Sequence, residues 1–258
     1  MNNILQEIIL NKEEEVGLLK RSLIFYQKPR VSGKSFKKSL LSSGLSVIAE
    51  IKRRSPAKGQ LSTIEDPVGL AFDYVRGGAT AISVLTDEHY FDGSIIDLGR
   101  VATAFRETEI TILRKDFIID PIQIVEAVLF GADAVLLIAS VLGDNLRSFL
   151  DYTKRMNIDA LVEVHDEKEI DLALNAGAEI IGVNNRNLTT FSVDINRSLQ
   201  LIRQMPPKII RVSESGVATA DTALKLYQSG FNAVLVGGAL VCAKDPGKLI
   251  KTMRGQYE

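Results

Sequence analysis

The sequence predicts an α/β fold, a (β/α)8 barrel of the TIM type, with an additional helical segment at the N-terminus. The first observation is length, because 258 residues match the ~250 typical of one such barrel. The second is a series of short, β-branched segments that alternate with helical stretches every ~20–35 residues, the size of one βα unit. The third is that several of these segments end on a charged or amide side chain, at the position of a barrel's rim.

Eight segments have the length and composition of strands. They lie near residues 46–52, 80–86, 109–115, 133–139, 160–165, 179–184, 208–214 and 232–237. Strands that alternate with helices pair in parallel through right-handed crossovers, and eight such strands close a barrel.

The helices between these strands have recognisable beginnings and ends. Asp66-Pro67 and Asp120-Pro121 each place an N-cap acid before a proline at the first helical position, and Asp166 caps a third helix. A glycine suited to the left-handed position that ends a helix precedes four of the strands; these glycines are Gly78, Gly131, Gly177 and Gly230.

Residues 1–40 precede the first strand and contain many helix-forming residues, so we expect an extra helical segment over one end of the barrel. No Pro-, Gly- or Ser-rich linker divides the chain, and residues 1–258 are therefore predicted to form one domain. The N-terminus lacks the basic region of a secretory signal, and no apolar stretch approaches ~18 residues. These features predict a cytoplasmic protein without a membrane partner.

The composition is that of an ordinary soluble domain, with 46% hydrophobic and 24% charged residues. The net charge of −1 predicts no nucleic-acid partner, because no polybasic surface accompanies it. Cys242 is the single cysteine, so an intrachain disulfide is excluded, and we expect it to be a small buried hydrophobic residue. His89 and His165 are too few for a histidine-rich metal site, and no metal is expected.

Five of the predicted strands end on polar side chains, although burying an unpaired charge between covered faces is costly. In a parallel barrel such tips converge at the carboxyl-end rim. The residues are Glu50 and Lys52, Lys115, Glu163, Asn184 and Glu214. Neighbouring cations and anions shift each other's pKa values, as general acid–base catalysis near neutral pH requires, and the sequence therefore predicts an enzyme.

Small residues follow the last two strands, as Ser215-Gly216 and Gly237-Gly238. The loops at these places often bind phosphate in (β/α)8 barrels, because small residues let backbone N–H groups approach an anion closely. Apolar side chains near other strand tips would suit a planar apolar substrate; they are Pro56, Phe91, Phe117 and Leu136.

Motifs at almost every strand tip, in order from about residue 46 to the end, resemble the indole-3-glycerol-phosphate synthase family. They are Glu50-Ile-Lys-Arg-Arg-Ser-Pro56 with Lys58-Gly59, Ser83-Val-Leu-Thr-Asp87 with Phe91-Asp-Gly-Ser94, Leu113-Arg-Lys-Asp-Phe-Ile118, Glu163-Val-His165, Gly182-Val-Asn-Asn-Arg-Asn-Leu188 and Ser213-Glu-Ser-Gly216. The N-terminal segment also resembles the family's extra helix.

The resemblance implies a step of tryptophan biosynthesis, an aromatic amino-acid pathway. The substrate would be 1-(2-carboxyphenylamino)-1-deoxyribulose 5-phosphate, which closes to indole-3-glycerol phosphate with loss of carbon dioxide and water. The enzyme would thus be a lyase and decarboxylase that needs no metal or organic cofactor, and we expect a monomer or a weak homo-oligomer.

The resemblance also implies roles for individual residues. Lys115 matches the general acid of ring closure, and Lys52 would pair with the anthranilate carboxylate near the phosphate. The acid and base for the loss of water would come from these two lysines and Glu163, with Glu50 close by. Asn184 and Glu214 would hold the ribulose hydroxyls, and Arg186 would orient carboxylates at the rim. The phosphate would be bound by Ser55, Ser215, Gly216, Gly237 and Gly238, near Lys52. The aryl ring would be enclosed by Pro56, Phe91, Phe117, Leu136 and Leu188.

Two alternatives remain open from the residues alone, because fold does not fix function. One is another sugar-phosphate aldolase or isomerase in which Lys115 forms a Schiff base with a carbonyl substrate. The other is a barrel that binds a phosphorylated ligand without turnover.

Overall fold

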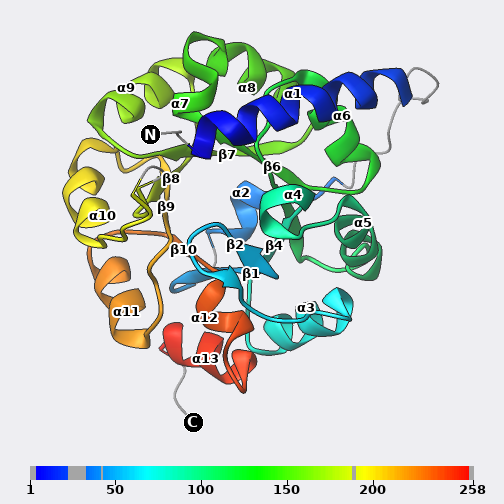
Figure 1. Ribbon diagram of the computed structural model, residues 1–258. Helices are drawn as coiled ribbons and strands as arrows, with labels where there is room; N and C mark the ends of the chain where they lie inside the picture. Colours follow the sequence, from blue (N-terminus) through cyan, green and yellow to red (C-terminus); the bar gives the residue numbers. More distant parts are fainter. Residues whose placement is uncertain (1–3, 23–32, 42, 188–189, 256–258) are drawn as a thin grey trace.

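Eight parallel strands form a closed barrel in this computed structural model, which describes residues 4–22, 33–41, 43–187 and 190–255 (Figure 1). The strands are β1 (Ser46–Ile51), β4 (Ala81–Leu85), β5 (Thr111–Lys115), β6 (Ala134–Ile138), β7 (Asp159–Val164), β8 (Ile180–Asn184), β9 (Ile210–Glu214) and β10 (Ala233–Val236). The barrel closes where β1 pairs with β10, with Val47 opposite Val234. The predicted fold class and all eight predicted strands are confirmed.

Helices cover the outside of the barrel (Figure 1). The longer ones are α3 (Pro67–Arg76), α5 (Ile95–Ala104), α6 (Pro121–Leu129), α8 (Leu146–Arg155), α9 (Glu167–Ala176), α10 (Asn196–Leu201), α11 (Ala220–Gln228) and α13 (Pro246–Met253). Single helical turns follow three of the strands as α4 (Glu88–Phe91), α7 (Ala139–Leu142) and α12 (Gly238–Val241). Two 3₁₀ segments are η2 (Gly143–Asn145) and η3 (Ile202–Gln204).

The predicted helix boundaries are confirmed. The side chains of Asp66, Asp120 and Asp166 each accept a hydrogen bond from a backbone N–H in the first turn of the helix that follows. The four glycines expected to end helices all have positive φ, with 93° at Gly78, 86° at Gly131, 91° at Gly177 and 102° at Gly230. A side chain would be strained in this conformation, so the sequence fixes where these helices stop.

Alternate residues of each strand belong to two apolar layers. Ile48 and Leu113 point into the barrel, whereas their neighbours Val47 and Ile112 pack beneath the outer helices. The inward-pointing series continues along each strand toward the carboxyl end. The next inward positions after Ile48 and Leu113 are therefore Glu50 and Lys115, which prepares the polar rim described below.

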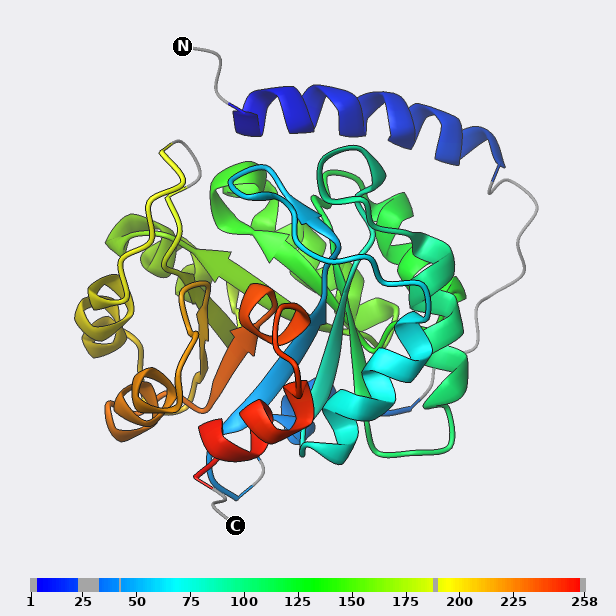
Figure 2. The ribbon, with the colours of Figure 1, turned by 60° about the horizontal axis from the view of Figure 1, so that its bottom comes forward.

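The N-terminal segment covers both ends of the barrel rather than the single end that we predicted. Helix α1 (Ile4–Ser22) lies across the carboxyl ends of the strands, as Figures 1 and 2 show. The short helix α2 (Phe36–Ser39) lies at the opposite end, where the Ser39 hydroxyl is 2.8 Å from that of Thr111 at the start of β5. Phe36 is fully buried against the inner layer, so this second helix closes the base of the barrel.

The loop after β1 contains a small hairpin. Its strands are β2 (Arg54–Ser55) and β3 (Gly59–Gln60), which pair in antiparallel fashion with Ser55 opposite Gly59. The hairpin projects above the barrel beneath α1 (Figure 2).

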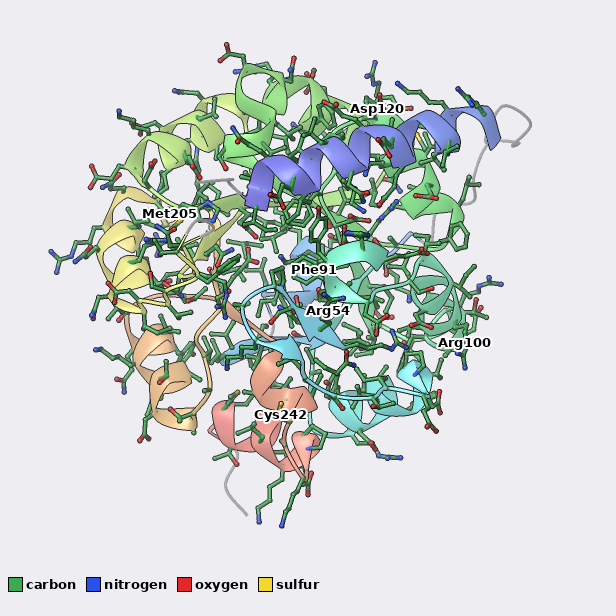
Figure 3. All side chains as sticks on the ribbon, viewed as in Figure 1. Arg54, Phe91, Arg100, Asp120, Met205 and Cys242 are labelled. Carbon is green, nitrogen blue, oxygen red and sulfur yellow. The ribbon has the colours of Figure 1, made fainter. Side chains whose placement is uncertain are left out.

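The prediction that Cys242 is buried is wrong. The residue is exposed at the C-terminal end of α12, near α13 (Figure 3). The aliphatic run before it forms the helical turn whose Leu240 enters the core, and the next residues turn outward. No helix within the described residues is both long enough and apolar enough to cross a membrane.

Candidate active site

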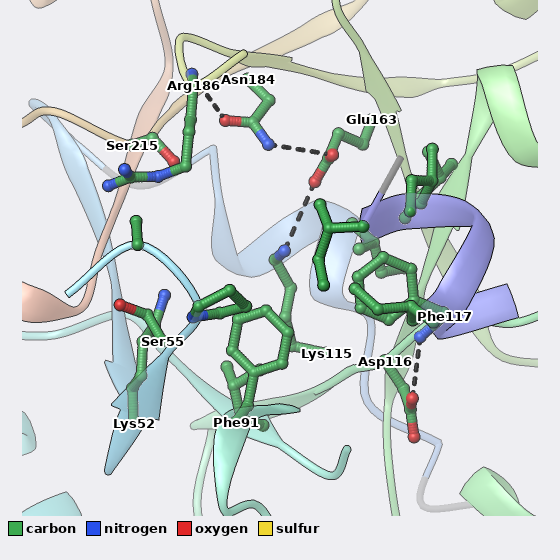
Figure 4. A pocket seen from close by; sticks show the side chains of 18 of the residues that line it. Lys52, Ser55, Phe91, Lys115, Asp116, Phe117, Glu163, Asn184, Arg186 and Ser215 are labelled. Carbon is green, nitrogen blue, oxygen red and sulfur yellow. Dashed lines mark hydrogen bonds and ion pairs between the residues drawn. The ribbon is translucent and has the colours of Figure 1, made fainter. Parts of the chain in front are cut away.

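A pocket opens at the carboxyl end of the barrel, beneath α1 and the hairpin after β1 (Figure 4). Every site residue that the sequence predicted, apart from Leu188, lines this pocket or the cavity that continues from it. They are Glu50, Lys52, Ser55, Pro56, Phe91, Lys115, Phe117, Leu136, Glu163, Asn184, Arg186, Glu214, Ser215, Gly216, Gly237 and Gly238. Leu188 lies outside the described residues.

Lys115 at the tip of β5 stands at the centre of a buried polar cluster. Its Nζ is 3.3 Å from Glu163 Oε2 and 3.8 Å from Glu214 Oε2. Asn184 Nδ2 donates a hydrogen bond of 3.0 Å to Glu163 Oε1, and Arg186 donates its backbone N–H to Asn184 Oδ1 (Figure 4). Side chains of β5, β7, β8 and β9 thus meet because each occupies an inward-pointing position at its strand tip.

The environment of Lys115 favours its charged form. Burial lowers the pKa of Lys115, but the carboxylates of Glu163, Glu214 and Glu50 outweigh this effect and raise the pKa above its ordinary value. The amine therefore holds a proton throughout the neutral range. An ammonium in a pocket of this kind is able to act as a general acid.

The two glutamates beside Lys115 differ in protonation. Burial raises the pKa of Glu163, but Lys115, His165 and the Asn184 amide together hold that pKa below its usual range. Burial also raises the pKa of Glu214, to about 8, and the charges of Glu163 and Glu50 act in the same direction. Neither carboxyl oxygen of Glu214 accepts a hydrogen bond from the described part of the chain. The cluster therefore contains an ionised and a protonated carboxyl group at neutral pH, a separation that acid–base catalysis uses.

His165 supports the ionised state of Glu163. Its Nε2 lies 3.4 Å from Glu163 Oε1, and its Nδ1 lies 3.2 Å from Glu169 Oε2. Burial lowers the pKa of His165, but the interactions with Glu169 and Glu163 raise it overall. Glu163 and His165, two residues apart at the end of β7, thus lie on the same face of the chain.

Two glycines make room for the carboxylates. A Cβ atom at Gly182 in β8 would overlap Glu214 Oε1, and a Cβ atom at Gly237 after β10 would overlap Glu50 Oε1. Sequence reasoning treated Gly182 only as part of a motif, because nothing in the sequence indicates which side chain crosses a neighbouring strand. Small residues at these two places let the acids lie over adjacent strands.

On the other side of the pocket, Lys52 lies between a carboxylate and an aromatic ring. Its Nζ is 3.4 Å from Glu50 Oε1 and 5.3 Å from the centroid of the Phe91 ring. The Phe91 and Phe117 rings are 6.1 Å apart, centre to centre, and together with Pro56 they form an apolar wall. Figure 3 places Phe91 near the middle of the carboxyl end.

Helix α1 completes this apolar side with residues that sequence reasoning missed. Ile4, Leu5 and Ile8 line the pocket. The four-residue spacing of Ile4 and Ile8 is a helical signal that would have marked one face of α1 as buried.

The opposite end of the pocket has the small residues and the cations of an anion site. Ser215 and Gly216 have left-handed backbones, with φ of 64° and 83°, and Gly237 and Gly238 lie beside them. Lys52, Lys58 and Arg186 also line this cavity. Backbone N–H groups next to cationic side chains suit a phosphate group.

Asn185, which sequence reasoning did not select, stabilises the turn at Ser215. The side chain is fully buried, and its Nδ2 donates to the backbone carbonyls of Glu214 at 2.9 Å and Ser215 at 3.1 Å. A left-handed non-glycine residue is strained, and these bonds help to hold the backbone there. No cluster of three or more His, Cys, Asp or Glu side chains among the described residues is arranged to hold a metal ion.

Comparison with known proteins decides the family. The model of the family described as Indole-3-glycerol phosphate synthase matches residues 5–253. The chain belongs to the indole-3-glycerol phosphate synthase family. An indole-3-glycerol phosphate synthase of Desulfotalea psychrophila is 43% identical over 257 residues, which cover 97% of this chain and 98% of that protein. One of Rhodococcus jostii is 49% identical over 213 residues, or 82% and 78% of the two chains.

Solved structures of low sequence identity support the fold. A 3-hexulose-6-phosphate synthase from Salmonella typhimurium has a TM-score of 0.66 at 15% identity, covering 82% of this chain and 97% of that one. A thiamine phosphate pyrophosphorylase from Pyrococcus furiosus has a TM-score of 0.63 at 17% identity, covering 86% and 96%. These likenesses confirm the barrel and carry no statement about chemistry.

The family assignment confirms the predicted activity. As an indole-3-glycerol phosphate synthase, the protein is a carboxy-lyase of tryptophan biosynthesis that acts on a phosphorylated small molecule. The Schiff-base alternative and the binding-only alternative are not favoured, since the curated relatives carry the synthase name over nearly their full length.

Proposed function

We propose that the pocket binds 1-(2-carboxyphenylamino)-1-deoxyribulose 5-phosphate in one orientation. The phosphate would lie against Ser215, Gly216, Gly237 and Gly238, and the aryl ring would lie between Phe91, Phe117 and α1. This orientation is supported by the residues that line the pocket. Cationic and small residues line one end, and apolar residues line the other. Lys115 then lies at the middle, beside the ribulose carbons that react.

In the first step a carbon–carbon bond forms between the aryl carbon that carries the carboxylate and the carbonyl carbon C2 of the ribulose. The carbonyl oxygen gains negative charge as the bond forms, and the Lys115 ammonium donates a proton to it. Lys52 pairs with the aryl carboxylate, which suits its place beside Phe91. This assignment is carried by the place of the Lys115 ammonium at the centre of the pocket, beside the carboxyl groups of Glu163 and Glu214, which favour its charged form.

The second and third steps restore the aromatic system. Carbon dioxide leaves from the aryl carbon, and the electrons of the broken bond return to the ring. The C2 hydroxyl then leaves as water with a proton from an acid, while a base removes a proton from C1 beside the nitrogen. We assign this acid and base to the set of Lys52, Lys115, Glu163 and Glu50, which lie around the same part of the pocket.

Asn184 and Glu214 are assigned to the ribulose hydroxyl groups. A carboxyl group with a pKa of about 8 is mostly protonated at neutral pH, so Glu214 is able to donate a hydrogen bond as well as accept one. Arg186 lies between the polar cluster and the phosphate end, where it would orient anionic groups.

For the protein as a whole, we propose that residues 1–258 act as one domain in the cytoplasm. We further propose a monomer or weak homo-oligomer that functions without nucleic acid, membrane, metal or organic cofactor.

A fluorescence assay tests the proposed chemistry directly, because the chain contains no tryptophan. The indole product would fluoresce against a background of tyrosine alone. We expect indole emission to grow in proportion to enzyme when the substrate is added without metal or cofactor. A flat trace from folded protein would refute the proposal.

A further inference from the structure

Lys12 on helix α1 is buried although α1 lies at the surface. Its residue exposure is 1%, and its Nζ lies 2.9 Å from Asp87 Oδ2, 3.0 Å from Asp116 Oδ1 and 2.6 Å from Glu15 Oε2. Lysine is almost never fully buried unless it is paired. Asp87 and Asp116 are themselves buried, so α1 is joined to the barrel by charged groups that are shielded from water.

Asp87 and Asp116 also each accept a hydrogen bond from the backbone at or beside a residue whose aromatic ring lines the pocket. Asp87 is the N-cap of α4 and accepts a hydrogen bond of 2.7 Å from the backbone N–H of Tyr90, which directly precedes Phe91. Asp116 Oδ1 accepts one of 2.8 Å from the backbone N–H of Phe117. The positions of both rings therefore depend on carboxylates that Lys12 neutralises.

Lys12 continues the face of α1 that borders the pocket. Ile4, Ile8 and Lys12 are spaced by four residues, and both isoleucines line the pocket, whereas Lys12 does not. Ile8 is only 3% exposed. One ammonium group is thus connected to three walls of the apolar end, which are α1 itself, Phe91 and Phe117.

The electrostatics agree with a permanently charged contact. Burial lowers the pKa of Lys12, but Asp116 and Asp87 outweigh this effect and raise the pKa above its ordinary value. Burial likewise raises the pKa of Asp116, yet Lys12 and Arg114 hold it below its ordinary value overall. The contact is therefore present across the neutral range.

We propose that Lys12 is a positioning residue for the half of the substrate pocket that receives the aryl ring. It fixes the positions of α1, Phe91 and Phe117 relative to one another. Lys12 touches no reacting atom and acts through Asp87 and Asp116. This inference rests on the proposed function in one respect, namely that the ring bound in this half of the pocket is the aryl ring of the substrate.

The test compares Lys12→Met with Lys20→Met. Lys20 lies on the same helix and also pairs with the barrel, 2.5 Å from Asp120 Oδ2, but its side chain is 55% exposed. For each variant, binding of indole-3-glycerol phosphate and of glycerol 3-phosphate is measured by calorimetry. The first ligand carries a ring and a phosphate, and the second carries the phosphate without a ring.

We expect Lys12→Met to weaken binding of indole-3-glycerol phosphate at least ten-fold and to leave glycerol 3-phosphate binding within two-fold of wild type. The Michaelis constant for the full substrate should rise by a similar factor, with a smaller change in turnover. Lys20→Met should change neither ligand's affinity. Equal effects on both ligands, or loss of thermal stability with unchanged affinities, would assign Lys12 a merely structural role and overturn the proposal.

A second variant keeps the test decisive if Lys12→Met does not fold. Lys12→Gln combined with Asp87→Asn removes one cation and one anion together, and the asparagine oxygen still caps α4. The same selective loss of ring binding is expected. Because both arms measure binding, a wild-type protein that binds both ligands without forming indole would refute the proposed function and leave this inference testable.

Discussion

Glu163 and Glu214 both lie close to the Lys115 ammonium, yet within the part of the chain that the structure describes only Glu163 accepts a hydrogen bond from a side chain. Asn184 and Lys115 contact the oxygens of Glu163 at 3.0 and 3.3 Å, whereas Lys115 is 3.8 Å from Glu214. The nearer partners stabilise the charged form of Glu163, and Glu214 instead keeps a proton. Two glutamates at equivalent strand tips thus enter the reaction in different protonation states.

Replacing Lys115 by alanine should lower the turnover number by at least ~10²-fold, the usual scale for loss of a general acid. The measurement is the steady-state rate at which indole-3-glycerol phosphate forms at saturating substrate, followed by its indole fluorescence. Lys20→Ala, at the exposed end of α1, serves as the control and should turn over normally. Near-normal turnover of Lys115→Ala would remove this residue from its assigned role.

Replacing Glu163 by glutamine should also lower turnover by at least ~10²-fold, because the amide cannot act as a base or hold the charge of Lys115. The amide keeps nearly the same shape and can still accept the bond from Asn184. Glu167→Gln, on the exposed surface of α9, is the matched control. A variant with unchanged turnover would show that the ionised carboxylate is dispensable.

Replacing Glu214 by glutamine should change how thermal stability depends on pH. In the wild type, the pKa of about 8 exceeds the ordinary value of 4.5, so the folded state binds the proton more tightly than the unfolded state. The associated stability is complete below pH 4.5 and is lost as the pH rises to about 8, by at most ~5 kcal/mol. A glutamine side chain does not titrate, so the variant does not lose this stability as the pH rises.

We therefore expect the melting temperature of Glu214→Gln, relative to wild type, to be at least ~4 °C more favourable at pH 9 than at pH 5, since ~2–4 °C corresponds to 1 kcal/mol at this chain length. Thermal melts at both pH values measure it. The difference between Glu167→Gln and wild type should stay constant. A constant difference for Glu214→Gln as well would contradict the raised pKa.

Replacing Gly182 by alanine should displace the Glu214 carboxylate, whose Oε1 occupies the space of the new methyl group. We expect a folded protein with turnover reduced about ten-fold, since a misplaced catalytic group commonly costs a factor of this order or more. Gly17→Ala in α1, where nothing lies within 4 Å, is the control and should be neutral or slightly stabilising.

A double variant separates the loss of turnover in Gly182→Ala from the loss of thermal stability that the overlap with Glu214 should also cause. Adding Glu214→Ala removes the overlap, so thermal stability should recover while turnover stays low. If thermal stability does not recover, the methyl group instead disturbs the nearby Leu161.

The barrel and its polar rim were predictable because both depend on local patterns. Alternation along a strand places Glu50, Lys115 and Glu163 on the inner face, and a parallel barrel brings the strand tips together. The capping residues predicted the helix boundaries for the same reason. Interactions within a few residues of sequence were sufficient in each case.

The missed features depend on contacts between distant segments. The sequence does not indicate that Lys12 reaches Asp87 and Asp116, that Gly182 faces Glu214, or that Asn185 supports Ser215. The opposite protonation of Glu163 and Glu214 is also invisible in sequence, because it follows from sub-ångström differences in distance and from burial.

Helix α1 is synthesised before the barrel strands, so it leaves the ribosome before the surface that binds it has formed. Asp87 and Asp116 follow β4 and β5, and β1 can complete its pairing only when β10 has been synthesised. During translation the apolar face of α1 therefore stays uncovered until the barrel strands that follow it have folded. A nascent chain that stops before β10 lacks the strand that pairs with β1, so the pocket at the carboxyl ends can be completed only after β10 has been synthesised.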